Sequence, residues 1–319
     1  DVLGSRGLGD VYKRQEVIVG STSMGNILTK QFYRQRKDFE DSCAGRDAGL
    51  TFPKGVRCST DIAYADDGIK AHMLDIYRPE DSQEKILPVI INVHGGGLII
   101  GNKEFNRYFC ALLCKKGFLV YSIEYRLIPD CLIYDQIADV FMAMDYIKER
   151  LAADGGDSSH VYMAGDSGGA CLITYANAIQ NSTNIARAAN VTPSGLRINA
   201  LGLISGTFYT SRFDKIGLFL PKYLYGRDYK KTSFAKYVNP ENRELLNSLA
   251  PVWFVTSHND FLRRYTTDFE KALTRAEREH ELVVFPKNKK LTHAFSVFEP
   301  FLPESSAVID MMVEYLRKF

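Results

Sequence analysis

Residues 160–180 have the sequence HVYMAGDSGGACLITYANAIQ, and this stretch decides the fold class. The apolar start, HVYMA, predicts a buried strand, and ACLITYANAIQ predicts a helix. Between them, Gly165-Asp166-Ser167-Gly168-Gly169 matches the pattern G-x-S-x-G. Small residues beside a serine allow a strained strand-to-helix turn that exposes the hydroxyl, and the helix N-terminus favours negative charge there. We therefore expect Ser167 to be a nucleophile; an idle serine in a glycine-rich turn is the alternative.

A second motif, His94-Gly95-Gly96-Gly97, follows the apolar stretch ILPVIINV. Three consecutive glycines lose much conformational entropy on folding, which favours a backbone that approaches a ligand closely. Their N–H groups, with that of Gly168, would hold the oxyanion of a tetrahedral intermediate, worth about 3–4 kcal/mol per donor. We expect His94 to be structural and to fix this loop. A phosphate loop is the alternative, but no Gly-Lys-Ser/Thr follows.

A nucleophilic serine needs a base, and the base needs an orienting acid. His293 lies in the loop after the predicted strand 281–285 and suits the base. Asp260 follows the predicted strand 252–257 and suits the acid. The order Ser167, Asp260, His293 is the one found where the serine follows a strand and precedes a helix. The alternatives are His258 as the base, and Asp268 or Asp214 as the acid.

The GDSGG motif also resembles the active-serine motif of trypsin-like proteases. In those proteins the serine comes last, after histidine and aspartate, in an all-β double barrel. Here Ser167 comes first and helical patterns recur along the chain. This interpretation is therefore excluded.

Apolar, β-branched stretches alternate with helical patterns beyond residue 55. Strands followed by helices of this length predict an α/β fold, with a mainly parallel sheet covered on both faces. An Asp-Asp-Gly turn between the first two stretches predicts an antiparallel start. The predicted strands are 56–64, 71–77, 86–93, 118–125, 160–165, 200–205, 252–257 and 281–285, and the predicted helices are 106–116, 133–153, 167–180, 262–279 and 305–318.

The remaining segments suggest a division of the chain into a core and a cap. Residues 1–15 lack periodicity and are expected to be a non-native or disordered leader. Residues 16–50 predict one or two polar helices, and 207–247 combine many aromatic and cationic residues. We expect both to belong to a cap over the site, with 51–206 and 248–319 as the core. A surface helix pair that only covers the sheet is the alternative.

Composition excludes several classes of protein. The 319 residues are 45% apolar and carry a net charge of +2, without the basic stripe of a nucleic-acid binder. No apolar stretch reaches the roughly 18–20 residues that span a membrane. The six scattered cysteines predict reduced thiols in a cytoplasmic protein, although a signal peptide lost upstream of Asp1 is left open. Cys110 and Cys114 are expected to pack on a helix face rather than bind metal.

Together with Asp260 and His293, the two glycine-rich motifs resemble those of the hormone-sensitive-lipase-like family of esterases. Residues 124–130, EYRLIPD, are similar to the family's D-Y-R-L-A-P-E segment, and the resemblance covers most of residues 50–319. It implies an α/β-hydrolase fold, an eight-stranded, mostly parallel sheet flanked by helices with a helical cap, and hydrolysis of short-chain carboxylic esters without metal or cofactor. The implied site comprises Ser167 as nucleophile, Asp260 as acid, His293 as base, and Gly96, Gly97 and Gly168 as oxyanion-hole donors.

Three positions depart from the family pattern. Leu98 follows HGGG where an aromatic residue is usual, Phe261 follows the acid where proline is usual, and Gly168 follows the nucleophile where alanine is usual. None removes a catalytic atom, but together they leave the acyl-chain preference open.

The hypothesis from sequence is a serine carboxylesterase that forms an acyl-enzyme on a small-molecule ester. A carbohydrate O-acetyl esterase is the alternative within enzymes, and a peptidase or amidase remains open. A catalytically inactive hydrolase fold serving as a ligand receptor is the alternative from another class. No nucleic-acid partner is expected, and a homodimer is left open.

Overall fold

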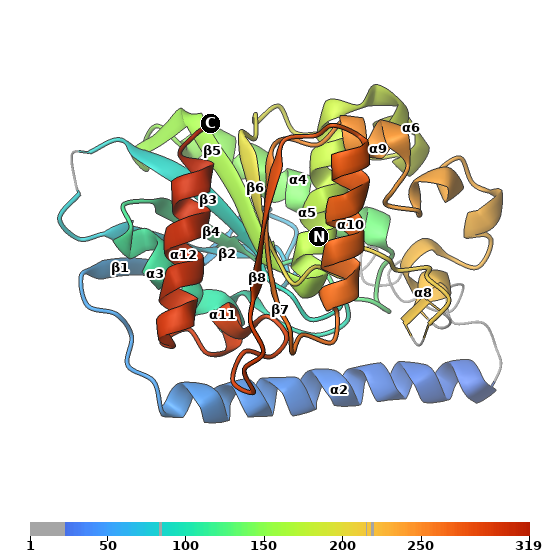
Figure 1. Ribbon diagram of the computed structural model, residues 1–319, viewed down its shortest axis with the longest axis horizontal. Helices are drawn as coiled ribbons and strands as arrows, with labels where there is room; N and C mark the ends of the chain where they lie inside the picture. The colour runs from blue at the N-terminus through green and yellow to red at the C-terminus, as the bar shows by residue number, and fades with distance from the viewer. Residues whose placement is uncertain (1–22, 83–84, 215, 218–219) are drawn as a thin grey trace, which may run out of the picture.

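The protein is built on one eight-stranded sheet, seen in a computed structural model that describes residues 23–82, 85–214, 216–217 and 220–319 (Figure 1). The strand order is β1-β2-β4-β3-β5-β6-β7-β8. β2 pairs antiparallel with β1 and β4, and the other neighbours are parallel, so the predicted antiparallel start is confirmed. The strands are β1 Val56–Ala63, β2 Met73–Pro79, β3 Leu87–Val93, β4 Leu119–Ile123, β5 Gly156–Asp166, β6 Ala200–Ile204, β7 Val252–Ser257 and β8 His280–Phe285.

Helices cover both faces of the sheet. α3 and α12 pack on one face, and α4, α5 and α10 pack on the other (Figure 1). The helices are α2 Ser23–Ala48, α3 Arg107–Lys115, α4 Ile133–Arg150, α5 Ser167–Asn181, α6 Thr183–Ala189, α8 Pro221–Tyr225, α9 Arg243–Asn247, α10 Arg263–Arg275, α11 Phe295–Phe298 and α12 Pro303–Leu316, with 3₁₀ turns η1 Lys103–Asn106, η2 Tyr229–Lys231 and η3 Ala235–Tyr237.

Coverage on both sides explains why the central strands are continuously apolar. Successive side chains of a strand point to opposite faces. Ile90 therefore packs in the core beneath α3 and α12, whereas Ile91 packs in the core beneath α4 and α5. Cys110 and Cys114 are both buried in the first of these cores, as the packing interpretation predicted. All six cysteines are free thiols.

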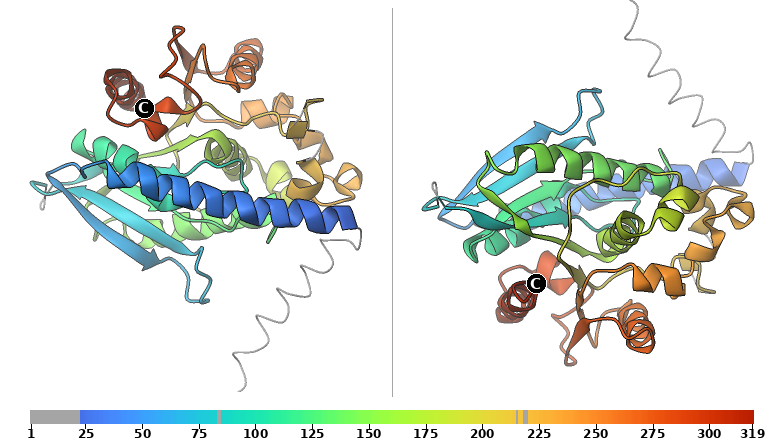
Figure 2. Two further views of the ribbon diagram at one scale, coloured as in Figure 1. Left: turned by 90° about the horizontal axis from the view of Figure 1, so that it is seen from below. Right: turned by 90° about the horizontal axis from the view of Figure 1, so that it is seen from above.

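Helix α2 lies across the end of the sheet at which the parallel strands finish (Figure 2). Its 26 residues form a single helix, although the proposed leader 1–15 and residues 16–22 lie outside the described part of the chain. Arg36 fixes the helix, because its guanidinium donates to the carbonyls of Ile99 (2.8 Å) and Ile128 (2.6 Å) and pairs with Asp130 (2.7 Å). A polar helix with few core contacts is thereby held over the sheet by charge-assisted hydrogen bonds.

Two segments between strands add to the packing around the sheet. Residues 181–199, between α5 and β6, contain α6, because the Ser182 side chain caps the N–H of Ile185 and Ile185 is buried. In 207–247, several aromatic rings belong to the core. Phe208 stacks on Phe269 with centroids 4.5 Å apart, and Phe234 packs against Tyr175 at 5.6 Å. Phe208 and Phe234 are therefore part of the hydrophobic core, although they lie in the aromatic-rich segment.

Candidate active site

Ser167 lies at the sharp turn between β5 and α5. Its φ is +48°, a conformation that costs a non-glycine residue about 1–2 kcal/mol. The turn is held because the Thr207 N–H donates to the Ser167 carbonyl at 3.0 Å. A side chain at Gly169 could not fit, since its Cβ would lie 2.2 Å from the Val93 carbonyl oxygen. The predicted need for small residues around the serine thus has a steric cause.

Three predicted residues form one chain of hydrogen bonds. Ser167 Oγ lies 2.9 Å from His293 Nε2, and His293 Nδ1 lies 2.8 Å from Asp260 Oδ1. Nδ1 therefore donates to the carboxylate, and Nε2 is left to accept the serine proton. Ser167 is 7% exposed and the Asp260 side chain is fully buried, so the chain runs from the pocket into the protein.

The surroundings of Asp260 keep it charged. Burial alone would raise the pKa of this carboxyl, but the hydrogen bond and charge of His293 outweigh burial and hold the pKa below its ordinary value. Further donors are the Thr256 hydroxyl (2.8 Å) and the Leu262 N–H (2.8 Å). A carboxylate that stays ionised can stabilise a positive charge on the imidazole.

The alternative residues lie elsewhere. His258 is exposed and bonds Arg263 at 2.7 Å, with no contact to Ser167. Asp268 pairs with Arg212 at 2.8 Å, and Asp214 accepts from the Tyr265 hydroxyl at 2.6 Å.

The glycine loop after β3 faces the serine turn. A Cβ on Gly168 would lie 2.9 Å from the Gly97 nitrogen, so the two backbones are in close contact. Within the described chain, no group accepts a hydrogen bond from the N–H of Gly96, Gly97 or Gly168. The Gly95 N–H instead donates to Asp166 Oδ1 at 3.0 Å, which ties the loop to the serine turn.

His94 fixes this loop, as expected from the sequence. It is completely buried, with Nδ1 2.8 Å from the Gly95 carbonyl oxygen and Nε2 2.8 Å from Glu124 Oε1. Burial lowers the pKa of His94, but the charge of Glu124 outweighs burial and leaves the pKa above its ordinary value. The ring also stacks on Tyr125 with centroids 4.4 Å apart.

Backbone strain is concentrated around the site. Among the described residues, seven that are not glycine have a positive φ, and four of them border the site. Leu98 follows the glycine loop, Ser167 is the turn serine, and Ala294 follows His293. Ser205 follows β6, and its hydroxyl accepts from the Ala294 N–H at 3.2 Å. Strained conformations of this kind persist where the surrounding structure enforces them, commonly at functional sites.

Ser167 opens into an apolar pocket of about 400 Å³. The aromatic part of its wall comes from α2, through Phe32 and Phe39, and from Phe261 and Phe298. The polar groups in the wall are few. The complete lining is Phe32, Gln35, Phe39, Gly96, Gly97, Ile99, Ile100, Asp166, Ser167, Thr207, Ile216, Leu220, Phe261, Leu262, His293 and Phe298.

Thr207 is a site residue that the sequence analysis missed. Its Oγ1 lies 3.2 Å from Ser167 Oγ, its side chain borders the pocket, and it is 5% exposed. The residue follows β6, the strand next to β5, and parallel neighbours finish at the same edge of a sheet. The strand order therefore places residue 207 near Ser167, but no sequence motif at this position predicts a site residue.

Comparison with known proteins decides the family. A family model described as the alpha/beta hydrolase fold matches residues 90–296, about two thirds of the chain. The chain belongs to this α/β-hydrolase family. It is the family of hormone-sensitive-lipase-like esterases, so the expected resemblance and fold class are confirmed.

Curated relatives share part of the sequence. The chain is 29% identical over 184 residues to a probable isoprenylcysteine α-carbonyl methylesterase of Oryza sativa, covering 54% of this chain and 44% of that protein. It is 32% identical over 120 residues to esterase LipQ of Mycobacterium tuberculosis, covering 37% and 28%. The chain therefore spans less than half the length of these relatives.

Solved structures share the fold over nearly the whole chain. Esterase B of Lactobacillus rhamnosis, inhibited by a tributyrin phosphonate, superposes with a TM-score of 0.85 at 22% identity, covering 92% of this chain and 95% of that one. In the described part of this chain, no helix is long and apolar enough to cross a membrane, and no group of three or more His, Cys, Asp or Glu residues is arranged to hold a metal ion.

Proposed function

We propose that the protein is a serine carboxylesterase that hydrolyses short-chain carboxylic esters through an acyl-enzyme. The observation that carries the proposal is the hydrogen-bonded chain Ser167–His293–Asp260 opening into an apolar pocket. At about 400 Å³ the pocket is near the small end of ligand sites, which span about 300–1,000 Å³. It suits an acyl chain of a few carbons.

In the proposed first step, Ser167 Oγ attacks the ester carbonyl while His293 Nε2 takes its proton. The oxyanion of the tetrahedral intermediate accepts hydrogen bonds from the N–H groups of Gly96, Gly97 and Gly168. Asp260 holds the imidazole in the tautomer that accepts at Nε2 and stabilises the imidazolium.

The tetrahedral intermediate then collapses, and the bond between the carbonyl carbon and the oxygen of the leaving alcohol breaks. The alcohol leaves with the proton from His293. Water then attacks the acyl-enzyme while His293 Nε2 takes its proton. The bond between the carbonyl carbon and Ser167 Oγ breaks, His293 returns the proton to Oγ, and the carboxylic acid leaves.

We also propose that α2 and residues 207–247 form the cap, within the boundaries 16–50 and 207–247, over the core 51–206 and 248–319. Support comes from the pocket wall, to which α2 contributes Phe32, Gln35 and Phe39 and the second segment contributes Ile216 and Leu220. Because rings such as Phe208 and Phe234 are buried in the core, they are not free to stack on sugars. The pocket wall also has few polar groups to bind sugar hydroxyls, which favours simple carboxylic esters over acetylated carbohydrates.

The first test replaces Ser167 with alanine and measures hydrolysis of p-nitrophenyl acetate and butyrate. We expect activity to fall to background and labelling by a fluorophosphonate probe to disappear. Ser159→Ala, an exposed serine at the opposite end of β5, is the matched control and should retain both. Hydrolysis by the Ser167→Ala protein at the native rate would reject the nucleophile.

The second test defines the substrate with a panel of esters. It varies acyl length from acetyl to octanoyl and includes tributyrin, acetylated xylan and an isoprenylcysteine methyl ester, the last because of the relatives' names. We expect kcat/KM to be highest for acyl chains of two to about six carbons, since the pocket is small and apolar. A preference for acetylated xylan would instead support the deacetylase.

A further inference from the structure

The two most exposed large apolar side chains in the described part of the protein lie close to one end of one helix. Phe213 is 92% exposed and Phe261 is 74% exposed. Phe261 precedes α10 by two residues. Phe213 is flanked by Arg212, which pairs with Asp268 of α10, and by Asp214, which accepts from the Tyr265 hydroxyl of α10.

Exposed cations come from the loop after β8 and from the first turn of α10, which follows Phe261. The loop after β8 presents Lys287, Lys289 and Lys290, all exposed. It is held against the segment before α10, because the Asn288 N–H donates to Asn259 Oδ1 at 3.1 Å. Arg264, in the first turn of α10, is also exposed.

None of these four cations lies within salt-bridge distance of a carboxylate in the described chain. We refer to Phe213, Phe261, Arg264, Lys287, Lys289 and Lys290 as the cationic rim.

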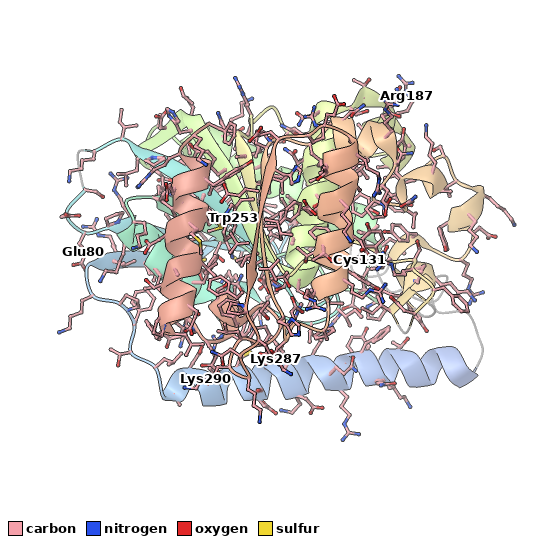
Figure 3. The ribbon with its side chains drawn as sticks, in the orientation of Figure 1. Glu80, Cys131, Arg187, Trp253, Lys287 and Lys290 are labelled. Atoms are coloured by element: carbon pink, nitrogen blue, oxygen red, sulfur yellow. The ribbon has the colours of Figure 1, made fainter. Side chains whose placement is uncertain are left out.

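The cationic rim borders the mouth of the active-site pocket. Phe261 lines the pocket, and its ring centroid is 4.5 Å from that of His293. Lys287 and Lys290 belong to the loop after β8 (Figure 3), which the Asn288–Asn259 hydrogen bond holds two residues from Phe261. Beyond Phe213, the cationic surface continues along Lys222, Arg227 and Lys230 around a second hollow that Phe213 also lines.

We propose that the cationic rim docks on an anionic lipid surface, so that the apolar part of an ester enters the pocket directly from the membrane. The proposal rests on the esterase function proposed above. Exposed aromatic rings partition into the headgroup region, and each Lys or Arg near an anionic bilayer strengthens binding by about fivefold. Lipid fits better than an acidic peptide, because a bilayer offers apolar contact to both exposed phenylalanines as well as negative charge to the cations.

The test is cosedimentation of the full chain with vesicles of phosphatidylcholine alone or with about 30% phosphatidylserine. We expect binding to the anionic vesicles and loss of binding at high salt, because exposed charges are screened. Replacing Lys287, Lys289 and Lys290 together by glutamine should weaken binding roughly 100-fold. Phe213→Ser should weaken vesicle binding by about tenfold, also on vesicles with a higher share of phosphatidylserine, because the lost contact is apolar.

The matched control replaces Lys54, Lys70 and Lys115, exposed lysines outside the rim, by glutamine, which changes net charge equally. This control should bind vesicles as the native protein does. All of these variants should hydrolyse soluble p-nitrophenyl butyrate at the native rate, which shows that they are folded.

Several results would overturn the proposal. The first is equal affinity of the native protein for neutral and anionic vesicles. The second is an equal loss of vesicle binding in the two triple lysine variants. The third is stronger binding to polyglutamate than to anionic vesicles at the same ionic strength, which would assign the rim to an acidic protein. Ser167→Ala separates the two proposals, since it should abolish hydrolysis and leave vesicle binding intact. Native hydrolysis without vesicle binding would reject the docking surface alone.

Discussion

Adding one methyl group at Gly168 tests how closely the glycine loop must approach the serine turn. A Cβ at this position would lie 2.7 Å from the Leu98 nitrogen, 2.9 Å from the Gly97 nitrogen and 3.0 Å from the Gly97 Cα. Ordinary contact begins near 3.4 Å, so the loop must move away by about 0.7 Å. All three contacts are with backbone atoms, which cannot rotate aside as a flexible side chain could.

The expected loss follows from the proposed oxyanion donors. Removing one such donor outright lowers kcat by about 10²- to 10³-fold. A shift of this size lengthens the hydrogen bond from the Gly97 N–H without removing the group. We therefore expect Gly168→Ala to lower kcat roughly 10- to 100-fold, with little change in KM.

The assay is steady-state hydrolysis of p-nitrophenyl butyrate, with circular dichroism and thermal unfolding measured on the same protein. The matched change is Gly97→Ala, because a Cβ there meets no atom within 4 Å and extends into open space. With a φ of +61°, that variant should lose about 1–2 kcal/mol of stability and change mainly KM. A native kcat in Gly168→Ala, or a loss fully explained by unfolding, would refute the reasoning.

Three further outcomes are expected. Thr207→Val should lower kcat several-fold by removing the hydroxyl 3.2 Å from Ser167 Oγ, whereas Thr207→Ser should retain most activity; equal kcat values in the two variants would show that the hydroxyl is dispensable. In the folded protein the pKa of His94 is raised above its ordinary value of 6.5. Protonated His94 therefore stabilises the fold below pH 6.5, and this stabilisation is lost as the pH rises through the raised pKa. Urea unfolding should therefore show Glu124→Gln more destabilised near pH 5.5 than near pH 9, and the opposite trend would contradict a charged His94. Arg36→Ala should cost about 2 kcal/mol of stability and raise KM, because α2 loses its charge-assisted hydrogen bonds; unchanged KM would mean that α2 does not depend on Arg36 for its position.

The core of the fold could be predicted from sequence because local pattern and tertiary environment agree there. β7 occupies 252–257, as predicted, since each of its residues is buried and apolar or small. The strand and helix around Ser167 are where their sequences predict them. The residues now proposed as a triad were also found in advance, because each follows a predicted strand and parallel strands finish at one edge of the sheet.

The pocket wall could not be predicted in the same way. Phe32 and Phe39 are seven residues apart and share one face of α2, but the helix is otherwise polar, so its position depends on Arg36 and on carbonyl groups far away in sequence. Thr207 lies in a segment, SGTF, with no motif. Its contact with Ser167 exists only because β6 is next to β5. Packing against distant elements, rather than local propensity, determines both features.

The four strained residues around the site imply that this protein would be more stable without its chemistry. Each left-handed conformation at Leu98, Ser167, Ser205 and Ala294 costs about 1–2 kcal/mol, against a total stability of about 5–15 kcal/mol for a typical domain. Glycine adopts a positive φ without this cost, so the fold alone would favour glycine at these positions, and the side chains present there are kept at the expense of stability.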